Sequence, residues 1–440
     1  MLTADELTIT TLGPCRIDSP LLPLLQHRQI SYNNVEETDR VLYDDCVHAI
    51  QARQCGVEHL PGFEPAGARK KIFFDPSKTR AGIVTCGGLC PGLNDVIRGI
   101  VMELYFHYGV KRIHGFCNGF QGFIPRYGRD VLDLTPDMVG HINEIGGTML
   151  GSSRGEQDVQ EIVDCLERMN INALFVIGGD GSLRGAQAIA SAALERNLKI
   201  AVVGVPKTID NDILFIEQSF GFLTAFSQAA ESICAAHVEA KSAPNGIGLV
   251  KLMGRHSGFI ACYASLARND ANFVLIPEIP FALEGERGLL SQLRERVERR
   301  GHAVIVVAEG AGQELIRQGE PQYDASGNVK LADIGTFLKE QIQADFKRNG
   351  AECNLKYIDP SYLIRSVPAS PFDAVLCLRL AHNAVHAAMC GRTKLVVARW
   401  RGRFVHLPIS LCVQGRNTVD PNGDLWMSVL ESTGQPPVMR

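Results

Sequence analysis

The chain has 440 residues, 45% of them hydrophobic and 21% charged, which is enough for about two or three domains with sizeable cores. The formal net charge of -4 gives no support to binding of nucleic acids or anionic membrane surfaces. The 13 cysteines are scattered through a long chain, a pattern that favours reduced thiols. No apolar run approaches a membrane span, and acidic residues near the N-terminus do not fit a signal peptide, so we expect a soluble, cytoplasmic protein.

Residues 1–78 contain several prolines and no strand and helix alternation. They read as an N-terminal extension that wraps a neighbouring surface or mediates assembly, and partial disorder is the alternative.

From residue 80 onwards, short apolar runs alternate with helical patterns. Expected strands lie at 81–85, 113–117, 173–177, 199–205, 246–252, 273–276, 304–308 and 355–358, and expected helices include 257–268, 286–300 and 371–389. Residues 394–408 read as a hairpin that turns at Arg401 and Gly402. This alternation predicts an α/β fold with two doubly wound, Rossmann-like lobes, in which ligands bind at the carboxyl ends of the strands.

The central motif is Gly178-Gly179-Asp180-Gly181-Ser182, at the junction between an apolar strand and a helical segment. Main-chain N–H groups at a helix start bind phosphate, glycine permits close approach, and a neighbouring carboxylate attracts a divalent cation. The motif therefore predicts a phosphate site with a metal at Asp180, and a plain glycine turn is the alternative.

Two further glycine-rich loops precede this motif. Residues 86–94 follow a strand and precede a helix, but they match neither the Walker loop nor the dinucleotide fingerprint. Residues 146–155 contain a single arginine, Arg154. We interpret Arg154 as a phosphate clamp, and an ordinary solvated surface residue is the alternative.

A polar segment, Pro206-Lys207-Thr208-Ile209-Asp210-Asn211-Asp212, follows the strand at 199–205. If it stays extended, the side chains of Thr208, Asp210 and Asp212 project to the same side. A hydroxyl and two carboxylates would then face one site, whereas the alternative is a turn rich in Asp and Asn.

A series of motifs in this order resembles the signature of the 6-phosphofructokinases over roughly residues 80–390. It consists of Gly87-Gly88-x-x-Pro91-Gly92-x-Asn94, Gly151-Ser152-Ser153-Arg154, Gly178 to Ser182, Pro206 to Asp212, Met253-Gly254-Arg255 and Tyr362-x-x-Arg365. Within the family, the chain is most similar to the ATP-dependent branch of plants, trypanosomatids and some bacteria.

The resemblance implies roles for individual residues. Asp210 would accept the proton of the sugar's 1-hydroxyl, Thr208 would contact the transferred phosphoryl group, and Asp212 would act through the metal or its waters. Asp180 would hold Mg²⁺. The nucleotide phosphates would contact Gly88, Arg154, Gly155, Gly179, Asp180, Gly181 and Ser182, and fructose 6-phosphate would contact Thr208, Ile209, Asp210, Met253, Gly254, Arg255, Glu309, Tyr362, Leu363, Ile364 and Arg365.

The resemblance also implies an organisation. Residues 79–221, completed by about 364–410, would form the nucleotide-binding lobe and 222–363 the sugar-phosphate lobe, with the active site between them and a C-terminal tail at 411–440. A homodimer or homotetramer under allosteric control is expected. Of the arginines that bind effectors in bacterial members, Arg98 is the one that can be matched in this sequence. Gly246 and Lys356 stand where well-studied bacterial members have arginines.

The phosphoryl donor depends on two residues. Gly181 leaves space where the pyrophosphate-dependent enzymes have an aspartate, which favours ATP, whereas Lys207 is typical of pyrophosphate users. We expect ATP to be the donor, with a pyrophosphate-dependent enzyme on the same sugar as the alternative. A catalytically silent regulatory subunit should lack Asp180, Asp210 or Arg154, and a NAD or lipid kinase would not explain residues 208–212 or 253–255.

Overall fold

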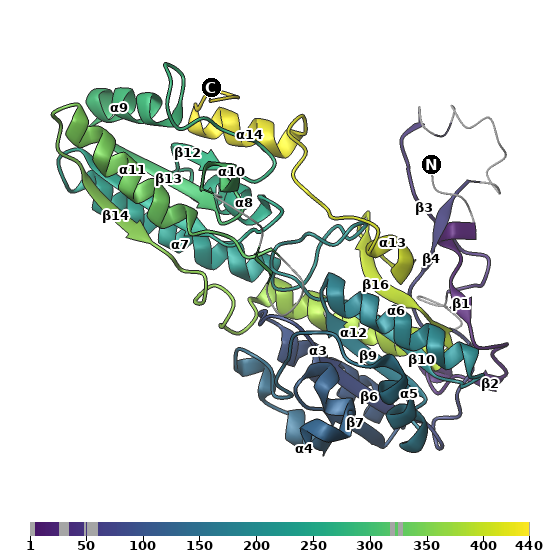
Figure 1. Cartoon of the computed structure of the whole chain (residues 1–440). Coiled ribbons are helices and arrows are strands. Elements are labelled where there is room, and N and C mark those ends of the chain that lie inside the picture. Colours follow the sequence, from purple (N-terminus) through teal and green to yellow (C-terminus); the bar gives the residue numbers. More distant parts are fainter. Residues whose placement is uncertain are drawn as a thin grey trace. The chain divides into compact units, whose positions relative to one another are not determined.

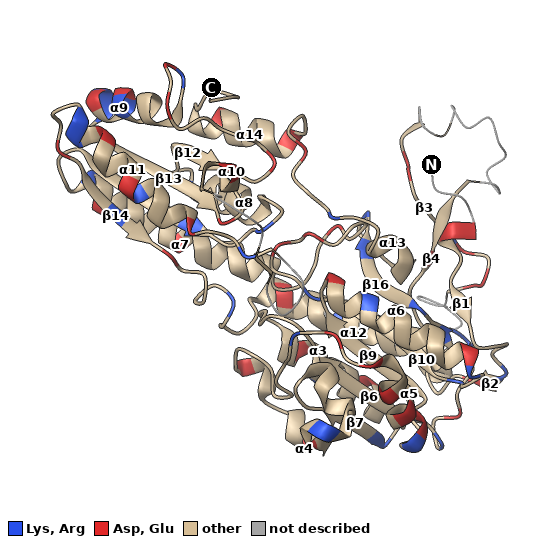
Figure 2. Cartoon of the chain, in the orientation of Figure 1, with Lys and Arg blue, Asp and Glu red and all other residues tan. Residues whose placement is uncertain are grey.

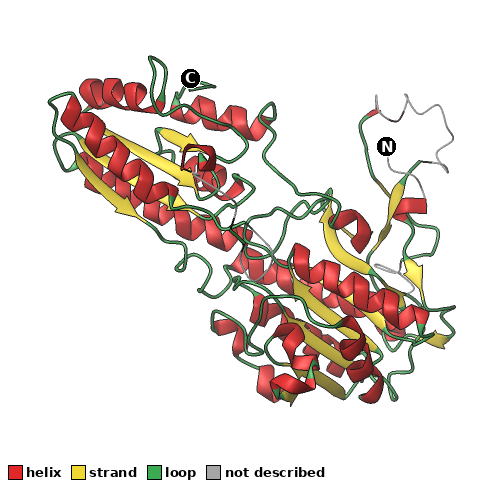
Figure 3. Cartoon of the chain, in the orientation of Figure 1, coloured by secondary structure: helices red, strands yellow, loops and turns green. Residues whose placement is uncertain are grey.

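The computed structural model describes residues 5–25, 35–47, 50, 60–316, 322–323 and 329–439. Part of the expected N-terminal extension, including residues 26–34 and 51–59, lies outside them. The chain forms two compact units: unit 1 comprises residues 1–208, 213–221 and 368–416, and unit 2 comprises 209–212, 222–367 and 417–440. Each unit combines strands and helices (Figure 3), which confirms the predicted α/β class.

The described part of unit 1 contains a nine-stranded sheet in the order β3-β4-β17-β16-β10-β9-β6-β7-β8. Its central strands are parallel: β16 (Leu395–Trp400), β10 (Ala201–Pro206), β9 (Ala173–Gly178), β6 (Arg80–Thr85) and β7 (Arg112–Phe116). Antiparallel strands complete the edges: β17 (Arg403–Pro408), β4 (Gly62–Pro65), β3 (Val41–Leu42) and β8 (Val131–Asp133).

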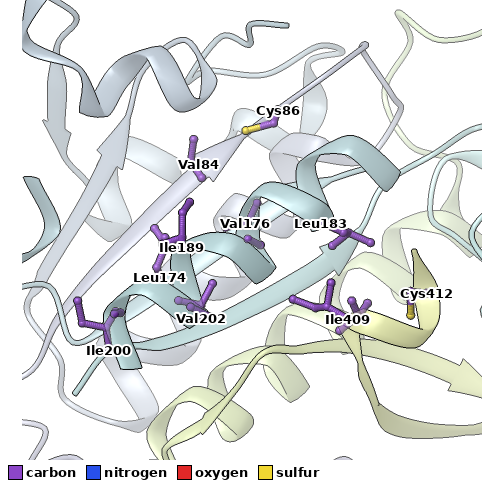
Figure 4. Close-up of a cluster of buried hydrophobic side chains, with 14 of the residues drawn as sticks. Val84, Cys86, Leu174, Val176, Leu183, Ile189, Ile200, Val202, Ile409 and Cys412 are labelled. Atoms are coloured by element: carbon purple, nitrogen blue, oxygen red, sulfur yellow. The ribbon is translucent and has the colours of Figure 1, made fainter. Parts of the chain in front are cut away.

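Helices cover both faces of this sheet (Figure 1). On one face α5 (Val159–Arg168) packs with α6 (Asp180–Glu195), and on the other α3 (Leu93–Met102) packs with α12 (Pro371–Met389). Alternate residues of the strands point to the α6 side, where Val176 and Val202 meet Leu183 and Ile189 in a buried cluster (Figure 4). This burial on both faces explains why β9 and β10 are apolar along their whole length.

Described parts of the N-terminal 78 residues belong to unit 1. β1 (Thr10–Thr11) pairs with β15 (Arg392–Thr393), and β2 (Ile17–Asp18) pairs with β5 (Lys71–Ile72). Shorter elements of unit 1 are η1 (Asp5–Leu7), α1 (Leu22–Leu25), the π-helical turn η4 (Glu103–His107), η5 (Gly119–Phe123), η6 (Pro125–Tyr127), α4 (Pro136–Val139), η7 (Ile142–Glu144) and α13 (Ile409–Cys412).

The described part of unit 2 contains a four-stranded parallel sheet in the order β12-β13-β11-β14. These strands are β12 (Phe273–Leu275), β13 (His302–Ala308), β11 (Gly246–Leu252) and β14 (Asn354–Ile358). The helices α7 (Phe222–Lys241) and α8 (Phe259–Arg268) pack on one face, and α9 (Leu289–Arg300) and α11 (Ile334–Arg348) on the other, while α14 (Asp424–Thr433) packs on α8 and β12. The short α10 (Gln313–Ile316) contacts α11.

Acidic and basic side chains are distributed over the helices of both units (Figure 2), in keeping with a net charge close to zero. In the part of the chain that the structure describes, no helix has both the length and the apolarity that crossing a bilayer requires.

Candidate functional site in each unit

In unit 1, strand β9 passes almost directly into helix α6. Gly179 is the N-cap, and no side chain caps the helix there. The first N–H groups of any helix have no intrahelical partner, and in α6 no side chain at the N-cap accepts from them. This is the arrangement that binds phosphate. Gly178 is required at the end of β9 because a side chain there would collide with Ser182 in the first turn of α6. The central motif thus forms the predicted strand and helix junction.

Both glycine-rich loops of unit 1 lie at this junction. The N–H of Gly87 donates to the carbonyl of Ser153 over 3.2 Å, and the Ser152 hydroxyl donates to the Gly87 carbonyl over 2.6 Å. The Lys207 ammonium, although its residue is only 6% exposed, donates to the Gly88 carbonyl over 2.7 Å. The structure therefore brings together loops that the sequence identified separately, and it places Lys207 against the first of them.

Three further candidates for phosphate contact in unit 1 are Arg154 and Gly155, at the end of the second loop, and Thr208, after β10. Arg154 is exposed, and Gly155 after it has a φ of 95°, which favours glycine. Thr208 follows β10, and its carbonyl accepts a hydrogen bond of 2.7 Å from the Ser219 hydroxyl. An exposed guanidinium on a glycine-flanked loop suits contact with a phosphate from solvent.

Asp180 is the first residue of α6 and carries the carboxylate expected to hold a metal. Arg184 Nη2 lies 3.3 Å from its Oδ2 atom, and Arg416 Nη2 lies 3.8 Å from the same oxygen. The other oxygen, Oδ1, is buried and accepts no hydrogen bond from the described residues, although Arg184 Nη2 lies 3.2 Å from it as an ion-pair partner. A carboxylate oxygen with unused acceptor capacity suits Mg²⁺, which is often bound through one carboxylate together with phosphates and waters. The described residues contain no cluster of three or more His, Cys, Asp or Glu side chains suited to a metal.

Gly181 faces open space. An added Cβ at this position would meet no atom within 4 Å, and the residue is exposed. No described protein atom therefore occupies the place where a side chain at position 181 would begin.

The segment after Lys207 bends instead of staying extended. Asn211 has a φ of 54°, in the left-handed region that asparagine tolerates better than most residues. The condition of an extended segment, under which Thr208, Asp210 and Asp212 would project to one side, is therefore not met. Thr208 belongs to unit 1, whereas residues 209–212 belong to unit 2.

Hydrogen bonds to main-chain carbonyl oxygens hold residues 209–212 within unit 2. The Ser257 hydroxyl donates to the Asp210 carbonyl over 2.9 Å, and the Asn417 N–H donates to the Asp212 carbonyl over 2.9 Å. Ile209 is buried. The Ser257 hydroxyl, in the loop that follows β11, thus helps to fix the position of the Asp210 backbone.

A cluster of charged residues lies where the parallel strands β11, β13 and β14 end. Burial raises the pKa of Glu309, and the positive charges of Arg255, Lys251 and Arg365 oppose that rise. Lys251 Nζ lies 2.8 Å from Asp359 Oδ2, so its charge is partly neutralised. Arginines beside a partly buried carboxylate suit a phosphorylated ligand with hydroxyl groups.

The two motifs expected to contact the sugar phosphate, residues 253–255 and 362–365, are held in different ways. Gly254 has a φ of 132°, and an added Cβ there would lie 2.5 Å from the Ser257 carbonyl oxygen, so glycine is required after Met253. In the second motif Tyr362 and Leu363 are exposed and Ile364 is buried, while the Arg365 guanidinium lies 4.9 Å from the centre of the Tyr362 ring. Ile364 therefore anchors this turn, and its neighbours are accessible.

The structure adds residues that sequence reasoning missed. Arg184 lies one helical turn after Asp180, so the spacing of four residues was a usable signal, whereas Arg416 is brought to Asp180 by tertiary structure alone. In unit 2 the Glu278 carboxylate accepts hydrogen bonds from the N–H groups of Gly258 and Val419. Glu278 thereby joins the start of α8 to the C-terminal segment.

Comparisons with known proteins identify the family of the chain. The family model described as Phosphofructokinase matches residues 80–388. The chain belongs to the phosphofructokinase family. It is 55% identical to an ATP-dependent 6-phosphofructokinase of Amycolatopsis methanolica over 98% of this chain and 95% of that protein. It is 47% identical to an ATP-dependent 6-phosphofructokinase of Trypanosoma brucei brucei over 90% of this chain and 82% of that protein.

Solved phosphofructokinase structures share the fold. A pyrophosphate-dependent phosphofructokinase from Marinobacter aquaeolei matches with a TM-score of 0.66 and 20% identity over 82% of this chain and 92% of that chain. The phosphofructokinase of Pichia pastoris in its T-state matches with a TM-score of 0.62 and 20% identity, over 90% of this chain and 41% of that chain. The two-lobed phosphofructokinase fold predicted from the motifs is therefore confirmed.

Close packing accounts for the glycine at position 246, where well-studied bacterial members have an arginine. An added Cβ would lie 2.6 Å from the carbonyl carbon of Ala240 and 2.8 Å from its Cα, so the end of α7 closes against β11. We expect Gly246→Ala to destabilise this phosphofructokinase by about 3 kcal/mol or more through overpacking against backbone. Urea unfolding measures the loss, and Gly181→Ala, which enters open space, is the control. Equal stability of the two variants would contradict the close packing.

Proposed function

We propose that this phosphofructokinase transfers the γ-phosphoryl group of ATP to the 1-hydroxyl of D-fructose 6-phosphate. The products are fructose 1,6-bisphosphate and ADP, and the reaction is the committing step of glycolysis. The observation that carries the proposal is the 55% identity, over 98% of this chain, to a relative named ATP-dependent 6-phosphofructokinase. The chemistry of the described residues supports it for the donor and the acceptor separately.

The proposal assigns the donor to unit 1. The N–H groups at the start of α6 and the loop residues Gly88, Arg154 and Gly155 would hold the phosphates of ATP. Asp180 would hold Mg²⁺, which neutralises phosphate charge when bound. Arg184 and Arg416 already lie beside Asp180 and would add positive charge at the same place.

The proposal assigns the acceptor to unit 2. Arg255 and Arg365 would bind the 6-phosphate of the sugar, and Glu309 would accept hydrogen bonds from its hydroxyl groups. Met253, Gly254 and the turn at residues 362–364 would surround the same ligand. The positive charges of Arg255 and Arg365 act on the pKa of Glu309, so both arginines lie near this carboxylate. Their proximity supports the assignment.

Asp210 would act as the general base. As the 1-hydroxyl oxygen forms its bond to the γ-phosphorus, the hydroxyl proton moves to the Asp210 carboxylate and the bond between the γ-phosphorus and the ADP oxygen breaks. Thr208 and Arg154 would contact the transferred phosphoryl group, and Asp212 would act through the metal or its waters. The hydrogen bond from Ser257 to the Asp210 backbone would keep the base in place.

An assay with two donors tests the proposal. Purified protein is mixed with fructose 6-phosphate and Mg²⁺, and either ATP or pyrophosphate is added. We expect turnover with ATP and little with pyrophosphate, because Gly181 leaves open space and the Lys207 ammonium donates to the Gly88 carbonyl. Turnover with pyrophosphate alone would establish the alternative donor, and turnover with neither would favour a regulatory subunit.

We further propose that the enzyme is a cytoplasmic homodimer or homotetramer under allosteric control. Membership of the phosphofructokinase family supports this proposal. Light scattering of the purified protein measures the assembly, and a monomer at assay concentrations would contradict it.

A further inference from the structure

The N-terminal segment of unit 1 lies against the end of helix α12. Antiparallel pairing of β1 with β15 places Thr11 opposite Arg392, and the Leu12 N–H donates to the Gly391 carbonyl over 2.9 Å. Figure 1 shows β1 at the edge of this unit. The pairing holds the residues that follow β1 next to Cys390, which ends α12 as its C-cap.

Two cysteines meet at this place. The Cys15 thiol donates to the Cys390 carbonyl oxygen over 3.3 Å, and the Cys390 thiol donates to the Lys71 carbonyl oxygen over 3.7 Å. Cys390 is fully buried, whereas Cys15 is partly exposed and so accessible to small molecules. The arrangement therefore places an accessible thiol against the backbone of a residue whose own thiol is buried.

The surroundings of Cys15 favour its thiolate. The hydrogen bond from Cys390 and the positive charges of Arg392 and Arg69 lower the pKa of Cys15 to about 7, although burial and Glu37 oppose them. Arg392 Nη1 lies 4.0 Å from Cys15 Sγ. By contrast, burial raises the pKa of the Cys86 and Cys412 thiols to about 12. Thiolate character and exposure together decide which cysteine reacts with an oxidant.

We propose that Cys15 is a peroxide-reactive thiol that forms a disulfide with Cys390. The Cys15 thiolate attacks hydrogen peroxide, so that a sulfur–oxygen bond forms, the oxygen–oxygen bond breaks and the released hydroxide becomes water on protonation. The Cys390 sulfur then attacks the Cys15 sulfenic acid, and the sulfur–sulfur bond forms as hydroxide leaves with the Cys390 proton as a second water. Two thiols are oxidised by two electrons in total, and one peroxide is reduced.

The link would join positions 375 residues apart in the sequence. Both cysteines lie outside residues 80–388, which the family model matches, so the site is separate from the residues assigned to catalysis. A cross-link across so long a stretch restricts the unfolded chain strongly. Oxidation should therefore stabilise the folded chain, by holding the N-terminal segment on α12.

Peptide mapping of the full chain tests the proposal. The reduced protein is treated with hydrogen peroxide at neutral pH, remaining thiols are blocked with N-ethylmaleimide, and tryptic peptides are identified by mass spectrometry. We expect a peptide pair joined through Cys15 and Cys390, with a Tm several degrees above that of the reduced protein. Iodoacetamide should label Cys15 half-maximally near pH 7.

Matched variants separate this site from general oxidation. Cys15→Ser should abolish both the linked peptides and the peroxide-dependent rise in Tm, whereas Cys46→Ser, at an exposed cysteine of unit 1, should retain both. In Cys390→Ala, dimedone should trap Cys15 as a sulfenic acid. Oxidation of Cys46 while Cys15 stays reduced, or a Cys15 sulfenic acid that never links to Cys390 in the unaltered chain, would overturn the proposal.

Discussion

Replacement of the base by serine, Asp210→Ser, is expected to lower kcat of the ATP-dependent reaction by about 10²-fold to 10⁴-fold, the usual contribution of a general base. The serine hydroxyl cannot accept the proton of the 1-hydroxyl as the new bond to phosphorus forms. The KM for fructose 6-phosphate should change by only a few fold, because sugar binding is assigned to Arg255, Arg365 and Glu309. Steady-state kinetics with both substrates varied measures the two parameters.

The structure makes this substitution a selective one. The Asp210 backbone is held by the Ser257 hydroxyl, which donates to its carbonyl oxygen and not to its side chain. The variant should therefore keep this hydrogen bond to the backbone, and circular dichroism checks that it is folded. Asp424→Ser, the same exchange at the start of α14 in unit 2, is the matched control and should leave kcat unchanged. Near-normal turnover of Asp210→Ser would remove Asp210 from the role of base.

The second large effect is expected at Gly181. Gly181→Asp should lower kcat/KM for ATP by about 10²-fold or more, because two like charges about 4 Å apart repel by about 4 kcal/mol near a protein surface. The new carboxylate would enter the space that faces the N-terminus of α6. Initial rates at varied ATP concentration measure the loss.

Two neutral variants separate the effect of side-chain charge on ATP kinetics from the effect of side-chain volume at this position. Gly181→Asn adds nearly the same volume as aspartate without its charge, and Gly181→Ala adds a single methyl group. Neither meets protein atoms at the Cβ, so both should fold, and alanine should stabilise the helix by up to about 1 kcal/mol. If Gly181→Asp leaves ATP kinetics unchanged, Gly181 does not determine the donor. If Asn and Asp are equally harmful, volume rather than charge is responsible.

Local signals were sufficient for much of the fold. Pro371 opens α12 at its first turn, and the hairpin turns at Arg401 and Gly402 as expected, since proline and glycine restrict or permit particular backbone conformations whatever lies around them. Helix α5 was missed, although Asp158 is an N-cap whose side chain accepts from two N–H groups, a signal present in the sequence. Helix α7 was also missed, because its alanines and many buried positions leave no clear apolar stripe.

The candidate sites likewise depend partly on local sequence and partly on tertiary structure. The sequence by itself determined the strand and helix junction at Asp180, because an apolar run, two glycines and a helical pattern act locally. Only the tertiary structure decided that Asn211 bends the segment carrying Asp210, that Arg416 approaches Asp180, and that Cys15 meets Cys390. The contacts of Arg416 and Cys15 join residues distant in sequence, and they depend on the order of strands in a sheet and on the packing of helix ends. No local spacing encodes such an order, so it is established only when the chain folds.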